Sequence, residues 1–168
     1  IDFETTGISP GQGARATEIA AVLVSGGRIV DRYASLMHSG AWVSHFIEQL
    51  TGISNAMLRD APPAALVMRE VLRFTKGVPL VAHNAAFDRP FVDRRLPASR
   101  DKAWACSQRE VPWKELGASS GALEFLMMKR CGLFFEGHRA DADCHAVLRL
   151  LQEPFDDGTL PMRLLLAS

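Results

Sequence analysis

Three short blocks with acidic residues, spread from the start of the chain to its last quarter, constrain the fold more than any other feature. Asp2 and Glu4 lie in Asp-Phe-Glu-Thr-Thr-Gly, Asp88 ends His-Asn-Ala-Ala-Phe-Asp, and His138 and Asp143 lie in His-Arg-Ala-Asp-Ala-Asp. If the fold brings the carboxylates together, they need cations to stay ionised, because like charges at close range repel. Core packing does not account for this spacing, and the blocks predict a site for divalent metal ions.

Length and composition predict a single compact domain. The chain has 168 residues, 48% of them hydrophobic, which is enough to bury a large fraction of its surface. Its 19 basic and 19 acidic residues cancel. This balance argues against a protein that coats long stretches of nucleic acid by charge alone, while a local contact remains allowed.

The cysteines and the apolar runs indicate a cytoplasmic protein that does not contact membranes. The three cysteines are odd in number and show no Cys-x-x-Cys pairing, which argues against a disulfide framework and a structural zinc site. No apolar run approaches the roughly 18 residues of a membrane span, and no charged-then-apolar leader is present. Because the chain starts at Ile1, directly before the first acidic residue, we expect part of the first strand to lie upstream.

Hydrophobic periodicity and turn residues predict a mixed sheet with helices on its faces. The predicted strands are 1–4, the hairpin 18–24 and 28–36, and the short apolar runs 79–82 and 103–106. Helices are expected within 41–60, from Pro63 to about Gly77, after Asn84, over 122–131 and over 141–151. Residues 153–168 form a C-terminal tail whose apolar end can pack on a neighbouring molecule or back on the domain, and we favour the second.

The strand and helix positions explain the residue types of the three blocks. Side chains alternate along a strand, so Asp2 and Glu4 project from one side while Phe3 enters the core. Asp88 is expected in the first turns of its helix, just past the end of a strand. Asp143 lies one turn into the last helix, and His138 belongs to the preceding loop. Oxygen-only ligands suit Mg²⁺ or Mn²⁺, whereas zinc would favour cysteine or several histidines.

Each block also has a structural interpretation. Two acids two apart on an edge strand can simply be a solvated face. Asn84 can cap a helix on which Asp88 is an exposed residue. His138 can cap a loop, and Asp141, which we interpret as solvated, competes with Asp143 for the functional role.

Taken together, the three blocks resemble the exonuclease motifs of the DEDDh 3′-to-5′ exonucleases, in particular the proofreading epsilon subunit of bacterial DNA polymerase III and its stand-alone relatives. The resemblance runs from Ile1 to about Leu151 and includes Leu-Thr-Gly-Ile-Ser after position 49. The spacing of five between His138 and Asp143 fits the histidine branch of that family. Two positions depart from its pattern, since Thr51 stands where histidine is common and Asp141 where an apolar residue is common.

The resemblance implies a ribonuclease-H-like fold, a mixed five-stranded sheet flanked by helices, and a single exonuclease domain over residues 1–168. By similarity Asp2, Glu4 and Asp143 hold one divalent ion, Mg²⁺ or Mn²⁺, and Asp2 bridges to a second that Asp88 supports. Such a pair of ions activates a water and stabilises the leaving 3′ oxygen. His138 would be the general base, and the product a nucleoside 5′-monophosphate. Residues that would bind the terminal nucleotide are Thr5, Thr6, Gly7, Asn84 and Phe87.

The expected partner is the 3′ end of a nucleic acid, either a single strand or a frayed terminus, with DNA favoured over RNA. A DNA polymerase subunit is a further candidate partner, because the chain carries no polymerase domain of its own. The oligomeric state, monomer or homodimer, is not specified by the sequence. Two rival functions are a catalytically idle nucleic-acid-binding or polymerase-docking module and a ribonuclease-H-type endonuclease, which would not need His138.

Overall fold

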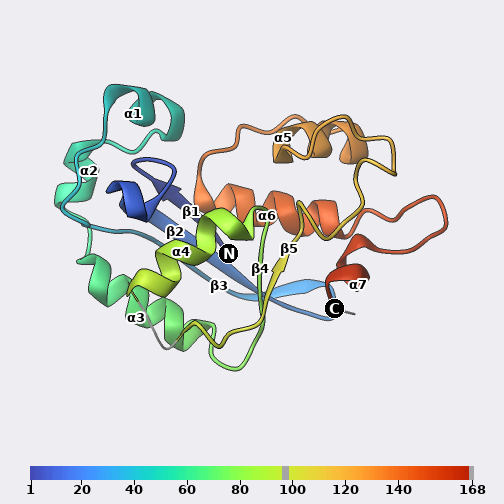
Figure 1. Ribbon diagram of the computed structural model, residues 1–168, viewed down its shortest axis with the longest axis horizontal. Coiled ribbons are helices and arrows are strands. Elements are labelled where there is room, and N and C mark those ends of the chain that lie inside the picture. The colour runs from blue at the N-terminus through green and yellow to red at the C-terminus, as the bar shows by residue number, and fades with distance from the viewer. Residues whose placement is uncertain (96–98, 167–168) are drawn as a thin grey trace.

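The computed structural model describes residues 1–95 and 99–166, which form an α/β fold of five strands and surrounding helices (Figure 1). The strands are β1 (Asp2–Thr5), β2 (Ala16–Ser25), β3 (Arg28–Leu36), β4 (Leu80–Ala82) and β5 (Trp104–Cys106). The helices are α1 (His45–Thr51), α2 (Asn55–Arg59), α3 (Ala64–Phe74), α4 (Ala85–Arg95), α5 (Leu123–Leu126), α6 (Ala140–Leu151) and α7 (Pro161–Leu166). A 3-10 turn forms at Pro10–Gln12, and a π-helical turn, Met127–Cys131, continues α5. The α/β class and the predicted order of elements are confirmed.

The strands form a three-stranded antiparallel sheet in the order β1-β2-β3 and a parallel pair, β4-β5. β2 and β3 join through Gly26 and Gly27, which have φ angles of 57° and 75°. A two-residue hairpin turn with both φ angles positive strongly favours glycine, so this dipeptide fixes the register of the hairpin. The two groups of strands meet where the α-amino nitrogen of Ile1 donates to Val81 O at 2.8 Å. In the described part of the chain, this hydrogen bond and the packing of Ile1 against Ala82 and Cys106 join the two groups, and no continuous ladder of a five-stranded sheet runs between them.

Opposite faces of the β1-β2-β3 sheet carry different layers. Phe3 and Ile19 pack with Val67 and Met68 of α3 and Phe91 of α4. Phe87 and Phe91, which lie four residues apart on α4, also pack on this face with ring centroids 5.4 Å apart.

The other face of the sheet is covered by α6. Ala20 of β2 packs with Ala140 and Cys144, and the small side chains let the helix approach closely. Since Asp2 pairs with Ala20 and Glu4 with Glu18, both acids of β1 project toward the α6 side.

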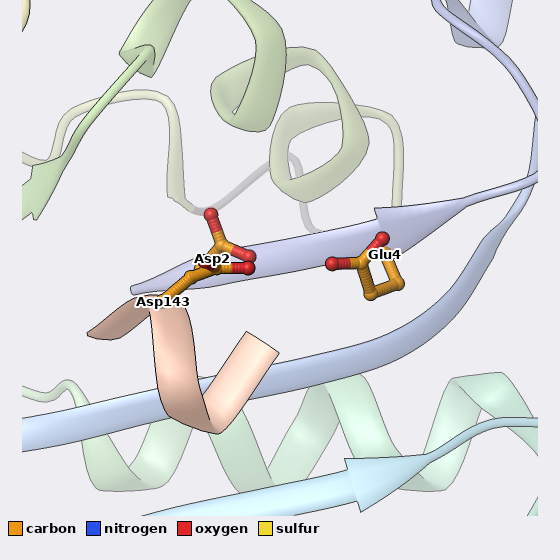
Figure 2. A group of neighbouring side chains, drawn as sticks. All are labelled: Asp2, Glu4 and Asp143. Carbon is orange, nitrogen blue, oxygen red and sulfur yellow. The ribbon is translucent and has the colours of Figure 1, made fainter. Parts of the chain in front are cut away.

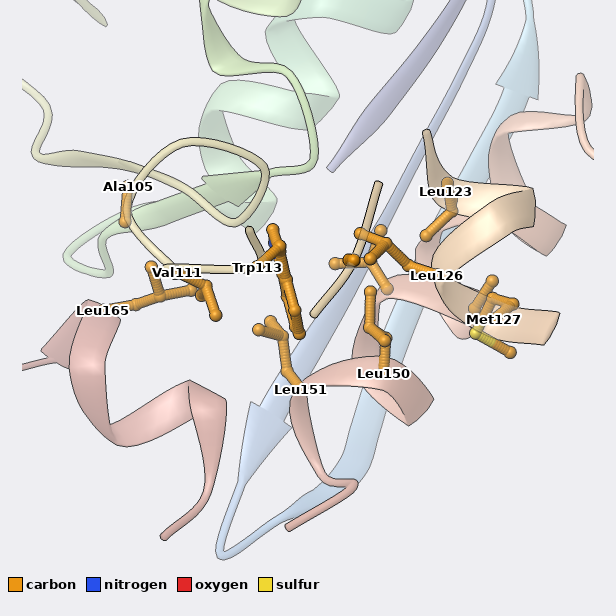
Figure 3. Packing of buried hydrophobic residues seen from close by; sticks show 12 residues of the cluster. Ala105, Val111, Trp113, Leu123, Leu126, Met127, Leu150, Leu151 and Leu165 are labelled. Atoms are coloured by element: carbon orange, nitrogen blue, oxygen red, sulfur yellow. The ribbon is translucent and has the colours of Figure 1, made fainter. Parts of the chain in front are cut away.

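A second part of the core lies between α5, α6, α7 and the segment after β5 (Figure 3). Trp113 is buried here, and its indole N–H donates to Ser107 O at 2.7 Å, so the ring carries no unpaired polar group. Leu165 of α7 packs into the same cluster. The C-terminal segment therefore packs back on the domain, as predicted, up to the last residues described.

No helix within residues 1–95 and 99–166 is long and apolar enough to span a lipid bilayer.

Candidate active site

Three of the predicted carboxylates converge at the junction of β1 and α6. Asp2 and Glu4 project from β1, and Asp143 projects from the first turn of α6 into the same space (Figure 2). One oxygen of each carboxylate lies within 4.8 Å of the others. The strand alternation and helix position predicted for these residues are confirmed, and the interpretation of Asp2 and Glu4 as a solvated face does not fit, because Glu4 and Asp143 are buried.

An irregularity in β1 directly follows the second acid. The register with β2 shifts between Glu4, which faces Glu18, and Thr5, which faces Ala16. A bulge of this kind bends the strand and re-aims side chains. The shift comes directly after the two carboxylates that project toward α6, and β1 ends one residue later, at Thr5.

Asp88 comes from a different element, the first turn of α4, which directly follows β4. Asp88 is only 2% exposed, and its Oδ1 has no hydrogen-bond partner in the described structure. Asp88 is close enough to Asp2 for its charge to raise the pKa of Asp2. The alternative of an exposed helix residue is therefore wrong for Asp88. A buried carboxylate oxygen without a hydrogen-bond partner fits the role of a cation ligand.

Burial raises the pKa of all four carboxyls, and the charges of neighbouring acids raise it further. Burial, followed by the charge of Asp143, raises the pKa of Glu4 to about 8. Burial raises the pKa of Asp88 to about 7 and that of Asp143 to about 6. Burial and the charges of the other three acids raise the pKa of Asp2 well above its usual value. The four groups cannot all be ionised at neutral pH without a compensating positive charge.

His138 lies on the loop before α6, as predicted, with its side chain 46% exposed. Its φ angle is 68°, the one positive value among non-glycine residues in the described part of the chain. This conformation is held by its backbone N–H, which donates to Asp143 Oδ2 at 3.0 Å. A strained backbone retained beside a carboxylate cluster fixes the position of the imidazole relative to Asp143.

An ion pair that the sequence did not reveal anchors the start of α6. Arg139 donates through Nη2 to Glu18 Oε1 at 2.7 Å and through Nε to Glu18 Oε2 at 3.1 Å. Glu18 Oε2 also accepts the backbone N–H of Ala140 at 3.0 Å. Glu18 thus caps the helix that carries Asp143, although it lies on β2 and no local capping pattern signals it.

Glu124, like Glu18, is an acidic residue near the site that sequence reasoning missed. Its Oε1 lies 3.8 Å from His138 Nε2. A Cβ atom added to Gly137 would stand 2.7 Å from this oxygen and 3.2 Å from Asp143 Oδ1. Gly137 therefore provides the space in which both carboxylates lie close to the loop of His138.

The predicted substrate-binding residues form two groups, one that directly follows Glu4 in the chain and one that directly precedes Asp88. The hydroxyl of Thr5 donates to Gly7 O at 2.6 Å. The backbone N–H of Thr6 donates to Arg15 O at 2.9 Å, and the backbone N–H of Arg15 donates to the Thr6 hydroxyl oxygen at 3.0 Å. These bonds brace the loop after β1, and Thr6 uses its own amide and hydroxyl within the protein.

The second group begins α4. The carbonyl oxygen of Asn84 accepts the N–H of Phe87 at 2.7 Å, and Phe87 is half-buried against Phe91. Asn84 thus starts the helix as predicted. The nucleotide contacts assigned to both groups stay predictions.

Asp141 and His83 have structural partners. Asp141 lies 3.5 Å from Arg32 and 3.8 Å from His145, and its side chain is 38% exposed, so the solvated interpretation holds only in part. His83 is buried between Ser107 Oγ at 2.9 Å and Gly121 O at 2.8 Å, and burial lowers its pKa. A neutral His83 thus ties the end of β4 to the segment after β5.

Comparison with known proteins agrees with this geometry. The exonuclease family RNase_T matches residues 1–151. The chain is 43% identical to 3′-5′ exonuclease DinG of Bacillus subtilis (strain 168) over 96 residues. This aligned stretch is 57% of the chain and 10% of DinG. The chain is 42% identical over 92 residues to the PolC-type DNA polymerase III of Caldanaerobacter subterraneus subsp. tengcongensis. That stretch is 55% of the chain and 6% of the polymerase.

The fold matches solved structures as well. The nuclease domain of 3′hExo, a DEDDh family member solved with bound rAMP, superposes with a TM-score of 0.72 at 21% identity, covering 95% of the chain and 92% of that domain. The chain spans a tenth or less of the two curated relatives. Since the family match extends over nearly all of it and includes every carboxylate of the cluster, this chain belongs to the RNase_T family of exonucleases.

Proposed function

We propose that this chain is a metal-dependent 3′-to-5′ exonuclease that releases nucleoside 5′-monophosphates from the 3′ end of a nucleic acid strand, with DNA as the favoured substrate. One observation carries the proposal: oxygens of Asp2, Glu4 and Asp143 lie within 4.8 Å of one another, at the start of a helix whose preceding loop presents His138. The family match and the relation to DinG support the same activity. Residues 1–168 are proposed to form a single exonuclease domain.

The donor set fits hard divalent cations. Every candidate ligand atom is a carboxylate oxygen, which suits Mg²⁺ or Mn²⁺. Asp2, Glu4 and Asp143 would hold one ion, and Asp2 with the partnerless Oδ1 of Asp88 would serve a second. When bound, the ions supply an activated water and stabilise the charge that develops on the leaving 3′ oxygen.

The protein's own groups supply the proton transfer and the alignment. His138 is exposed enough to meet a water at the scissile phosphate, and its loop is fixed by the bond from its N–H to Asp143 Oδ2. A ring nitrogen of the imidazole can accept the proton of that water. General base catalysis of this kind contributes about 10²- to 10⁴-fold.

The terminal nucleotide would be held between the loop after β1 and the start of α4. Thr5, Thr6 and Gly7 form one side, and Asn84 with Phe87 forms the other. The exposed part of the Phe87 ring offers a surface for base stacking, which is tolerant of sequence. A fixed loop on one side and a helix start on the other would orient the terminal phosphodiester toward the four carboxylates.

The test is digestion of 5′-labelled DNA and RNA oligonucleotides of the same sequence with Mg²⁺, with Mn²⁺ and with a chelator. We expect a ladder that shortens stepwise from the 3′ end, with nucleoside 5′-monophosphates as products and no cleavage in chelator. Preferential loss of RNA would make the enzyme an exoribonuclease, an outcome that the rAMP complex of the 3′hExo nuclease domain makes worth testing. No ladder with either metal would leave an idle binding or docking module, and cleavage of a circular strand would identify an endonuclease.

A polymerase partner is proposed on the relation to the PolC-type DNA polymerase III. A proofreading role predicts that the ladder assay removes a mismatched 3′ end faster than a matched one, because a frayed terminus reaches the site more easily. Equal rates on the two ends would argue for a stand-alone enzyme.

A further inference from the structure

The proposed function gives no role to Glu124, which lies in the first turn of α5 beside the loop of His138. Its Oε1 lies 3.8 Å from His138 Nε2, and each of the two side chains is 46% exposed. Burial raises the pKa of Asp143, and the nearby charge of Glu124 adds to that rise. Among the described residues, the carboxylates whose oxygens meet at one possible metal site are those of Asp2, Glu4 and Asp143, and Glu124 is not one of them.

The backbone on both sides of Glu124 is held in place. Leu123 and Leu126 of α5 are buried in the core cluster that α6 also lines (Figure 3). Two residues before α5, Gly121 O accepts a hydrogen bond of 2.8 Å from His83 Nε2. His83 directly follows β4, so this bond ties the start of α5 to the strand end that leads into α4. Glu124 thus stands on a fixed support, and its side-chain rotamer decides where its carboxylate lies.

The backbone of His138 is also fixed, whereas its ring is not. The His138 N–H donates to Asp143 Oδ2 at 3.0 Å. Within residues 1–95 and 99–166 the ring makes no hydrogen bond, and the acid at ion-pair distance from it is Glu124. A half-exposed side chain can adopt several staggered rotamers, each of which points the ring nitrogens in a different direction. A contact that selects one rotamer therefore decides how often the ring is in place for proton transfer.

Gly137 leaves the space in which Glu124 reaches the ring. A Cβ atom at this position would stand 2.7 Å from Glu124 Oε1, closer than side chains pack. The φ angle of Gly137 lies outside the left-handed region, so the backbone itself does not call for glycine here. What the approach of Glu124 to His138 requires is the absence of a side chain at this position.

We propose that Glu124 is a positioning residue for His138, an assignment that rests on the proposed function. Its carboxylate accepts the Nε2–H of the imidazole and so selects one rotamer of the ring, with Nδ1 left to accept the proton of the attacking water. The distance between Oε1 and Nε2 is about 1 Å longer than a charge-assisted hydrogen bond. Hydrogen bonds of catalytic groups are often long in structures without substrate and tighten when it binds. A carboxylate that orients a basic histidine is a recurring element of hydrolytic sites.

The experiment is a double-mutant cycle on the 168-residue chain, measured by steady-state digestion of a 5′-labelled oligonucleotide, DNA or RNA, whichever the enzyme digests faster. We expect Glu124→Ala to lower kcat at least about tenfold, because a small misplacement of a catalytic group is costly. KM should stay within about twofold, and Mn²⁺ affinity should be near normal. In the His138→Ala background the same substitution should cause no further loss, because no ring remains to be positioned. Glu124→Gln keeps an oxygen that can accept the Nε2–H and should recover most of kcat.

Two further measurements separate this role from others. Glu136→Ala removes an exposed acid from the same loop, two residues before His138, and should leave kcat and KM unchanged. Three-bond NMR couplings of the His138 side chain in Mg²⁺ should report one χ1 rotamer in the wild type and averaging over rotamers in Glu124→Ala. The couplings are measured without turnover, so they do not depend on nuclease activity.

Four results would overturn the proposal. A loss of kcat from Glu124→Ala that is as large in the His138→Ala background as in the wild type would show that Glu124 acts independently of the ring. A fall in Mn²⁺ affinity in Glu124→Ala would make Glu124 a metal ligand, and an equal loss of kcat in Glu136→Ala would reduce its role to surface charge. Rotamer averaging in the wild type would contradict the positioning even in an active enzyme. A wild-type chain that digests no strand but holds the ring in one rotamer would instead overturn only the proposed function.

Discussion

Glu18 and Arg139, which are 121 residues apart, form a two-pronged ion pair that ties β2 to the residue preceding α6. Glu18 is buried, whereas the side chain of Arg139 is 48% exposed. Glu18 also faces Glu4 across the strands, so Arg139 neutralises a carboxylate that would otherwise repel the metal ligand. The pair thus supports the start of α6, where His138 and Asp143 meet the acids of β1.

Replacing Arg139 should destabilise the protein more than replacing an equally exposed arginine elsewhere. Arg139→Ala leaves the buried Glu18 carboxylate without its counter-ion, and we expect a loss of about 2 kcal/mol in the free energy of unfolding. The matched control is Arg149→Ala, since Arg149 is 49% exposed and pairs with Glu153 on the surface of α6. That change should cost less than about 0.5 kcal/mol. Urea titrations measure both, and equal losses would contradict a special role for the Glu18 pair.

Gly137 should be required for activity more than for stability. In Gly137→Ala the new methyl group would stand 2.7 Å from Glu124 Oε1 and 3.2 Å from Asp143 Oδ1. The flexible Glu124 can rotate away at little cost, but Asp143 must shift by a few tenths of an ångström. We expect a fall in kcat of about tenfold, because small misplacements of catalytic groups are costly, with a change in stability below about 1 kcal/mol.

The control for this variant is Gly11→Ala, where the nearest atom to an added Cβ lies at an ordinary 3.5 Å. Steady-state kinetics and urea titration of the two variants separate the effects. Unchanged kcat in Gly137→Ala would show that the space beside Asp143 is not needed for catalysis.

The parts of the site that obey local rules were predictable from the sequence. Alternation along β1 placed Asp2 and Glu4 on one side, and the position of Asp143 one turn into α6 followed from helical periodicity. The loop position of His138 followed from its spacing to Asp143. These inferences depend on neighbours in the chain, which is where sequence patterns carry most information.

The contacts that lie far apart in sequence could not be predicted in this way. Nothing near Glu18 signals that it caps a helix on the other side of the sheet. Glu124 lies on α5, whereas His138 lies on the loop before α6, and the approach of Glu124 to His138 depends on the absence of a side chain at Gly137. The division of the strands into two groups also could not be read from the sequence, because strand pairing depends on tertiary register rather than on propensity.

His138 and Asp143 should differ in what their removal does to metal binding. His138→Ala removes the proposed base but no ligand, so turnover should fall by about 10²- to 10⁴-fold with near-normal Mn²⁺ affinity. Asp143→Ala removes a ligand and the acceptor of the His138 N–H, so both turnover and affinity should fall. Isothermal titration with Mn²⁺ and single-turnover digestion measure the two quantities. Normal Mn²⁺ affinity in Asp143→Ala would remove Asp143 from the proposed ligand set.

The stability of the metal-free protein should fall as pH rises from about 4 to 8. The carboxyls of Glu4, Asp88 and Asp143 have folded-state pKa values of about 8, 7 and 6, against 4.5 for a free Glu and 3.8 for a free Asp. Between these limits the folded state binds more protons than the unfolded state, so raising pH favours unfolding. The contribution of these three protonated carboxyls to the free energy of unfolding is therefore complete below pH 4 and is lost once the pH passes about 8.

Divalent cations should reverse this dependence, because they bind the deprotonated carboxylates and compete with protons. We therefore expect the urea midpoint at pH 8.5 to lie below that at pH 5.5 in chelator, and the order to invert with saturating Mn²⁺. A control is the Asp88→Asn variant, which cannot ionise at that position and should show a weaker pH dependence in chelator. A metal-free protein whose midpoint rises steadily from pH 5.5 to 8.5 would show that the four carboxyls do not titrate as a buried, mutually repelling cluster.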